Sequence, residues 1–187
     1  MSKKDMLNNI LFGVKIDVDK LLEILPQFKK MRNFDQKHPA HCYKLLEHTI
    51  KVVEPLSFKL VLKLAGLLHD FGKLLLEEIY DDKGVRRYWG HEELSRKYAK
   101  DFLESMGYDE KIVNDACLLI EKHGTKISPD KVSIMQQVEL LGKEIFEMLI
   151  ELQRADLLAH SEWYIEKKLN DLEKIEKIYY NEICKNN

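Results

Sequence analysis

The feature that most constrains this chain is an apolar stretch, residues 60–70, that ends in a histidine and an aspartate. Lys63 is its only charged residue before the last position. A helix that is apolar on most faces is typical of a protein interior, so His69 and Asp70 should come at the end of a buried helix. Burying an aspartate costs several kcal/mol unless it is paired or binds a metal. The stretch therefore predicts a metal site where the helix ends.

Composition indicates a helical globular protein. The chain has 187 residues, of which 45% are hydrophobic and 33% charged, with only 8 Gly and 4 Pro. This length is enough for one domain with a substantial core, or for a domain with a small appendage. The composition argues against disorder, and the expected fold class is all-α.

Charge and cysteine content narrow the range of partners and compartments. The net charge of -2 gives no sign of a broad nucleic-acid groove or of an anionic membrane as partner. The three cysteines are far apart and form no Cys-x-x-Cys motif, which is typical of reduced thiols in a cytoplasmic protein. The sequence contains neither a secretory leader nor an apolar run long enough for a membrane span. We therefore expect a cytoplasmic location and no membrane partner.

Apolar spacing of three to four residues predicts helices along most of the chain. Residues 1–16 are expected to be a loosely held lead-in, and residues 78–89, with a glycine turn, a loop or short β-hairpin. The final helix is expected to pack against the bundle or against a partner chain, which would give an oligomer. The expected helices are 17–32 (divided at Pro26), 40–54, 58–70, 91–106, 109–123, one after Pro129 that breaks near Gly142, 143–160 and 162–184.

Six polar residues fall on the inner faces or at the ends of these helices. Four histidines and two aspartates in such places are hard to explain as ordinary core residues. Imidazole and carboxylate donors together suit Mn, Fe, Zn, Ni or Co without selecting among them. Six ligands exceed what one catalytic metal needs, but they suit two metals that share a ligand and clamp a phosphoryl group between them. The residues are His48, His69, Asp70, His91, His123 and Asp156.

These residues resemble the H…HD…D signature of the HD-domain metal-dependent phosphohydrolases, and residues 69–73 (His-Asp-Phe-Gly-Lys) are similar to the family's HDxGK motif. The similarity is closest to the HD domain of bacterial CCA-adding enzymes, the tRNA nucleotidyltransferase/poly(A) polymerase family. It includes a histidine-rich segment, residues 38–43, and an aromatic-Gly-His-Glu block, residues 89–92. It covers residues 36–160. Nothing in the chain resembles the nucleotidyltransferase head of those enzymes, which favours a free-standing hydrolase over CCA addition.

The resemblance implies an HD-domain helical bundle with two divalent ions, which could be Mn, Fe, Ni, Co, Zn or Mg. Residues 1–35 would be a helical lead-in, 36–160 the HD domain and 161–187 a C-terminal helix packing on it. One metal would be held by His48, His69, Asp70 and Asp156, and the second by Asp70, His91 and His123. Asp70 would be catalytic as the bridging ligand, with a hydroxide generated at the metals attacking phosphorus. Lys73 could contact a phosphate oxygen or help to protonate the leaving group; the alternative is a solvated charge at a helix end.

The substrate-binding candidates are cationic residues close to the predicted metal ligands. Arg86 and Arg87 could clamp a phosphate, and Lys126 follows His123 closely; each could equally be a solvated charge. Tyr88 and Trp89 could stack on a base or form a lid on the core. His38 and His41 could line the pocket, whereas His160 is expected at the surface.

The expected activity is hydrolysis of a phosphomonoester or phosphodiester in a nucleotide or RNA-derived substrate. Two alternatives stay open. The first is a mononuclear nucleotidase that uses only His48, His69, Asp70 and Asp156. The second is a non-catalytic RNA-binding or regulatory module that keeps the metal as a structural staple.

Overall fold

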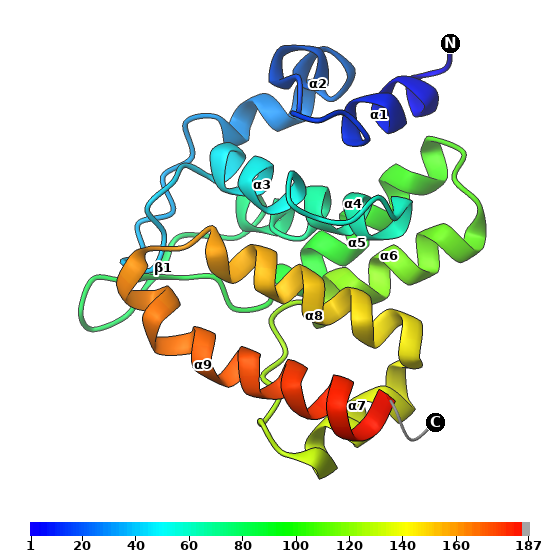
Figure 1. Cartoon of the computed structure of the whole chain (residues 1–187). Coiled ribbons are helices and arrows are strands. Elements are labelled where there is room, and N and C mark those ends of the chain that lie inside the picture. Colours follow the sequence, from blue (N-terminus) through cyan, green and yellow to red (C-terminus); the bar gives the residue numbers. More distant parts are fainter. Residues whose placement is uncertain (185–187) are drawn as a thin grey trace.

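The computed structural model describes residues 1–184 and forms a helical bundle with one small hairpin (Figure 1). The predicted all-α class and the hairpin within residues 78–89 are both confirmed. The elements are α1 (Lys3–Leu11), α2 (Val18–Ile24), the 3-10 helix η1 (Pro26–Met31), α3 (Leu45–Val53), α4 (Leu60–Leu68), the 3-10 helix η2 (Phe71–Leu74), β1 (Ile79–Tyr80), β2 (Arg86–Arg87), α5 (His91–Ser105), α6 (Glu110–Lys122), α7 (Lys131–Leu141), α8 (Lys143–Leu158), α9 (Glu162–Ile178) and the π-helix η3 (Tyr179–Ile183).

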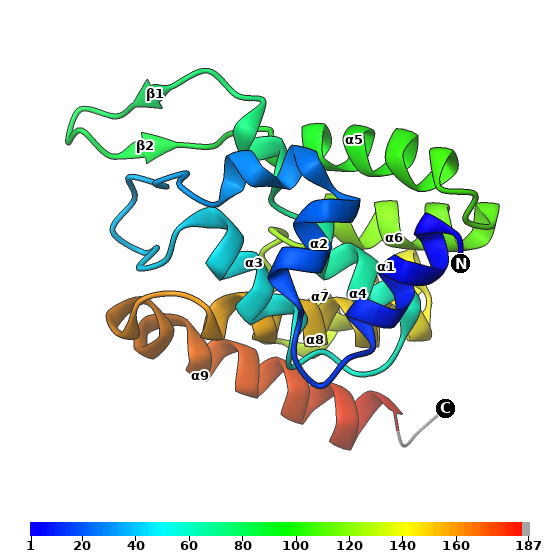
Figure 2. The same ribbon diagram turned by 90° about the horizontal axis from the view of Figure 1, so that it is seen from above.

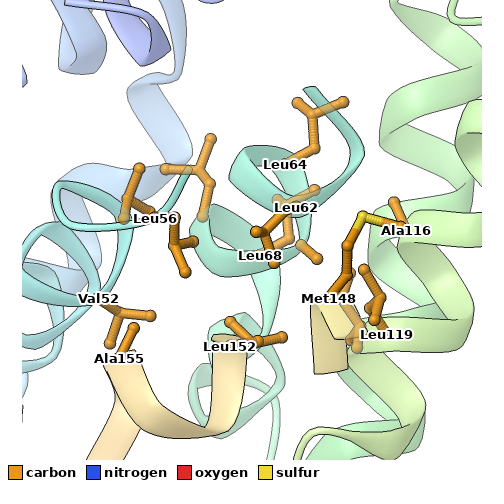
Figure 3. Packing of buried hydrophobic residues seen from close by; sticks show 14 of the residues in the cluster. Val52, Leu56, Leu62, Leu64, Leu68, Ala116, Leu119, Met148, Leu152 and Ala155 are labelled. Carbon is orange, nitrogen blue, oxygen red and sulfur yellow. The ribbon is translucent and has the colours of Figure 1, made fainter. Parts of the chain in front are cut away.

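Helix α4 is the central element, as its apolar sequence predicts. It packs against α3, α6 and α8, and Leu62, Leu64 and Leu68 are buried among side chains from all three of these helices (Figure 3). Its single charged residue, Lys63, is also buried. The Lys63 Nζ donates to the backbone carbonyls of Val53 (2.8 Å) and Glu54 (3.2 Å) at the end of α3. A buried ammonium is tolerated here because it satisfies carbonyls that the end of a helix leaves without partners.

The antiparallel hairpin lies at one corner of the bundle, beside the segment that leads into α3 (Figure 2). Ile79 pairs with Arg87 and Tyr80 with Arg86. The Arg86 backbone N–H also donates to the carbonyl of Lys37 at 3.2 Å. This bond joins the hairpin to the segment before α3.

The N-terminal residues are better ordered than the sequence predicts. Instead of a loose lead-in they form α1, which begins with a capping box between Ser2 and Asp5. Leu7 and Leu11 are fully buried and belong to the same hydrophobic core as the rest of the chain. The capping box stabilises this short helix, because it provides hydrogen-bond partners for backbone N–H groups of the first turn that have none within the helix.

The start of one helix also differs from expectation by several residues. The helix predicted to start at residue 40 begins only at Leu45, because Lys44 is extended and the Leu45 N–H donates to the Phe34 carbonyl. Residues 40–44 are therefore a loop beside the site. Asp17 caps α2 as predicted, and Pro26 divides the expected 17–32 helix by starting the 3-10 helix η1.

The C-terminal helix packs on the bundle rather than extending away from it. Helix α9 lies alongside α8 (Figure 1), and Arg154 of α8 forms an ion pair with Glu176 of α9. One hydrophobic core thus includes residues of the lead-in, the central region and the C-terminal helix. The division of the chain into domains at residues 35 and 160 stays a prediction. Among residues 1–184, none of the helices is long and apolar enough to span a membrane.

Candidate metal centre

The end of α4 places Asp70 at the centre of a cluster of imidazoles. Asp70 comes two residues after the last residue of α4 and is 2% exposed. Two residues later, Gly72 allows η2 to press against the start of α5. A Cβ at Gly72 would lie 2.6 Å from the Ser95 nitrogen and would overlap the backbone oxygen of His91. The glycine of the His-Asp-Phe-Gly-Lys segment therefore brings His91 close to Asp70.

One oxygen of Asp70 faces two histidines from different helices. Asp70 Oδ2 lies 3.4 Å from His48 Nε2 and 3.3 Å from His69 Nε2. Asp156, on the inner face of α8, completes this half of the cluster. Its Oδ1 is 3.1 Å from His48 Nε2 and 3.7 Å from His69 Nε2. Four donor groups from three separate regions of the sequence thus lie close together.

The other oxygen of Asp70 faces a second pair of histidines. Asp70 Oδ1 lies 3.1 Å from the Nε2 of His91, at the start of α5, and 3.8 Å from the Nε2 of His123, at the end of α6. The two Nε2 atoms are 3.3 Å apart. Asp70 therefore stands between two groups of donors and presents one oxygen to each.

All four histidines are oriented in the same way. The Nδ1 of each lies near a backbone carbonyl, of Ala159 for His48 (3.2 Å), Gly66 for His69 (2.8 Å), Tyr88 for His91 (2.7 Å) and Ile120 for His123 (2.6 Å). With Nδ1–H donating to that carbonyl, each Nε2 is left with a lone pair directed into the cluster. This is the arrangement in which proteins hold metal-ligating imidazoles.

The cluster fits a divalent cation. His48 Nε2 and His69 Nε2 are buried and have no hydrogen-bond partner within residues 1–184, although carboxylate oxygens lie near them. Buried polar atoms without partners are rare and costly. In each of two groups, His48–His69–Asp70 and Asp70–His91–His123, the donor atoms lie within 4.8 Å of one another. Mixed imidazole and carboxylate donors suit divalent transition metals.

The charges of the cluster are strongly coupled. Burial disfavours the imidazolium form of His69, but Asp70 and Asp156 outweigh it and raise the His69 pKa to about 10. Burial also opposes ionisation of Asp70, and Lys73 and His69 nevertheless hold its pKa well below the usual range. Burial, together with the charge of His69, lowers the pKa of His123 to about 4. Without metal, the positive charges of Lys73 and His69 thus compensate the buried carboxylate of Asp70.

Residues 37–161 match the sequence model of the HD domain. The chain belongs to the HD domain family. Members of this family bind divalent metals and form a superfamily of metal-dependent phosphohydrolases, and the Asp70 cluster supplies donors that could hold such ions.

The chain is also similar to the CC-adding tRNA nucleotidyltransferase of Thermus thermophilus, with 27% identity over 125 residues. The aligned region covers 64% of this chain but only 29% of the relative. The resemblance to the HD domain of tRNA nucleotidyltransferases is thereby confirmed.

Lys73 of the HD motif is not a solvated charge. It is 4% exposed, and its Nζ donates to Asp70 Oδ2 at 2.7 Å and to Gln36 Oε1 at 2.8 Å. In this position it orients Asp70 and neutralises part of its charge.

The three predicted substrate-binding cations have different surroundings. Arg86 is buried, pairs with Glu78, and has its guanidinium 4.8 Å from the ring centre of Phe34, so it is not the solvated loop charge of the alternative interpretation. Arg87 is half-buried and forms an ion pair with Asp81. Lys126 is exposed. Their role in binding substrate stays a prediction.

Two hollows open onto the cluster. The first, here called the hairpin hollow, has a volume of about 350 Å³ and is lined by His41, Lys73, Arg87, Trp89 and His91 among others. The second, here called the α9 hollow, has a volume of about 390 Å³, and its walls include His123, Lys126, Asp156, His160, Tyr164 and Lys168.

Sequence reasoning missed two residues of the site. Gln36 is 1% exposed and connects Lys73 to the backbone carbonyl of Tyr43; it lies in a linker without periodicity, so the sequence carries no signal for it. His160 was expected at the surface, but its side chain is 9% exposed and its ring centre lies 4.5 Å from that of His41. His160 lies four residues after Asp156 and so on the same helical face, and this spacing could have predicted its position beside the site.

Proposed function

We propose that this protein is a metal-dependent phosphohydrolase that uses two divalent ions bridged by Asp70 to hydrolyse a phosphoester bond in a nucleotide or RNA-derived substrate. The observation that carries the proposal is the position of Asp70 between two groups of donors. Its Oδ2 faces the Nε2 atoms of His48 and His69, which Asp156 also approaches. Its Oδ1 faces the Nε2 atoms of His91 and His123. A mononuclear centre would leave one of the two groups without a use.

When bound, two divalent ions would polarise a phosphoryl group and lower the pKa of a water molecule to about 7. The residues of this chain do the rest. The Nδ1 bonds fix the imidazoles in a single orientation before any ligand arrives. Lys73 holds Asp70 Oδ2 through a bond of 2.7 Å, which keeps the carboxylate plane directed at both groups.

The nucleotide or RNA-derived character of the substrate is supported by the relative and by the surface near the site. The relative's name states an activity on tRNA. Beside His91, the side chain of Trp89 is 71% exposed and offers an aromatic face on which a base could stack. The cysteines Cys42, Cys117 and Cys184 are free, which agrees with the reducing cytoplasm we propose as its location.

Hydrolysis of bis(4-nitrophenyl) phosphate by the Mn(II)-loaded protein tests this proposal. We expect turnover that EDTA removes and that Asp70→Ala abolishes. Asp101→Ala is the matched control, because Asp101 is an exposed aspartate of α5 outside the cluster. Turnover that survives Asp70→Ala, or the absence of metal-dependent turnover in the wild-type protein, would contradict the proposal.

A further inference from the structure

The hairpin hollow and the α9 hollow share the metal-ligand cluster as a common wall. His91 lines the first hollow, and His123 and Asp156 line the second. The Nε2 atoms of His91 and His123 are only 3.3 Å apart across this boundary. A phosphate placed at the cluster would therefore have open space on two sides.

The hollows also meet at a second point. His41 of the hairpin hollow and His160 of the α9 hollow are in contact, with ring centres 4.5 Å apart. His160 in turn stacks on Tyr164, with ring centres 4.9 Å apart and planes inclined by 26°. Aromatic rings thus continue from one hollow into the other past the cluster.

Each hollow is suited to a separate organic group. With about 350 and 390 Å³, both are within the range of small-molecule sites, which begins at about 300 Å³. The hairpin hollow has the exposed ring of Trp89 in its wall. The α9 hollow has both Tyr164 and Lys168 among its lining residues. Aromatic faces next to cationic groups are what proteins use to hold bases and their phosphates.

Resting on the proposed function, we infer that the substrate is a phosphodiester with a nucleoside on each side of the scissile phosphate, one in each hollow. A phosphomonoester has a single organic group and would fill only one of them. Hydrolysis of the diester breaks one P–O ester bond. Water supplies the hydroxyl that stays on phosphorus and the proton that goes to the leaving nucleoside oxygen.

The test compares adenylyl-(3′→5′)-adenosine, which carries two nucleosides, with the monoesters 3′-AMP and 5′-AMP on the Mn(II)-loaded protein. We expect kcat/KM for the dinucleotide to exceed that for either monoester by roughly tenfold or more. A higher kcat/KM for a monoester would overturn the inference. Hexa-adenylate, assayed in parallel, shows whether the phosphodiester belongs to a dinucleotide or to an RNA strand. Faster cleavage of the dinucleotide would indicate a short substrate, and faster cleavage of the hexamer would indicate an RNA strand.

Variants in each hollow show whether both are occupied. Trp89→Ala and Lys168→Ala should each raise the KM for the dinucleotide by roughly fivefold. The matched controls, Phe58→Ala and Lys167→Ala, change an equally exposed aromatic residue and the neighbouring lysine of α9, neither of which lines a hollow. An unchanged KM in either hollow variant would overturn the inference.

Binding provides a readout that does not depend on turnover. Calorimetry should show adenosine binding to protein already saturated with 5′-AMP, because the two ligands occupy different hollows. Failure of adenosine to bind the saturated protein would overturn the two-group inference while leaving bis(4-nitrophenyl) phosphate hydrolysis intact. Loss of all metal-dependent hydrolysis would instead contradict the proposed function itself.

Discussion

Replacing Lys73 by alanine should destabilise the metal-free protein far more than the metal-loaded protein. In the metal-free state the Lys73 Nζ is a buried partner of Asp70 Oδ2 at 2.7 Å. Removing one member of a buried ion pair typically costs about 3–5 kcal/mol. The lower end of that range applies, because His48 and His69 remain within 3.4 Å of the same oxygen. At about 2–4 °C per kcal/mol for a chain of this size, Tm should fall by roughly 6–12 °C.

Divalent ions bound at the cluster would balance the negative charge of Asp70 in place of Lys73. The cost of Lys73→Ala in the Mn(II)-loaded protein should then be about 1 kcal/mol, the loss expected for an ordinary truncation. The difference of about 2 kcal/mol must appear as tighter metal binding by the variant, roughly thirtyfold. Turnover should nevertheless slow with the metal content unchanged, because Asp70 loses its orientation.

Urea denaturation with EDTA and with Mn(II) measures both costs, and Lys63→Ala is the matched control. Lys63 is as deeply buried as Lys73, but its Nζ donates to the carbonyls of Val53 and Glu54 rather than to the cluster. Its replacement should therefore destabilise both forms equally. If Lys73→Ala also costs the same with and without metal, the reasoning that Lys73 and the metals share Asp70 is refuted.

Three further predictions follow from the same geometry. His91→Ala should retain the fold and lose one of two metals, because His91 contacts only Asp70 Oδ1 among the two oxygens; elemental analysis that still finds two ions per chain would contradict this. His91 O and Ser95 N would both lie too close to a Cβ at Gly72, at 2.6 Å for Ser95 N, so Gly72→Ala should lower the free energy of unfolding by about 1–3 kcal/mol or more; urea denaturation beside Gly84→Ala, where a Cβ meets nothing within 4 Å and only the positive φ of 71° is strained, should show the smaller loss. In EDTA, the protonated form of His69 should contribute its full stability below about pH 6.5, which is the pKa of histidine in the unfolded chain. This contribution should be lost as the pH rises towards the folded-state pKa of about 10. A free energy of unfolding that stays constant between pH 6 and 9.5 would argue against the coupling of His69 to the carboxylates.

Much of the fold and of the candidate site follows from local sequence patterns. The buried helix α4, the hairpin and the helices that carry His91, His123 and Asp156 could be predicted because apolar spacing and turn residues act over a few positions. The convergence of the six candidates could be predicted only through their chemistry, since buried imidazoles and carboxylates need one another or a metal.

The features that were missed depend on contacts distant in sequence. The late start of α3 at Leu45 depends on the bond from the Leu45 N–H to the Phe34 carbonyl. The burial of Arg86 depends on its contacts with Glu78 and Phe34. Gln36 and His160 reach the site through tertiary packing alone. For Lys73 and Arg86, a solvated position stayed open as the alternative to a role at the site, because the sequence does not reveal buried partners such as Asp70 and Glu78.

The central claim, that Asp70 bridges two divalent ions, is tested most directly by loading the protein with Mn(II), counting the ions and recording the EPR spectrum. We expect two ions per chain with the exchange-coupled spectrum of a carboxylate-bridged pair. One ion per chain, or two ions with uncoupled spectra, would contradict the claim.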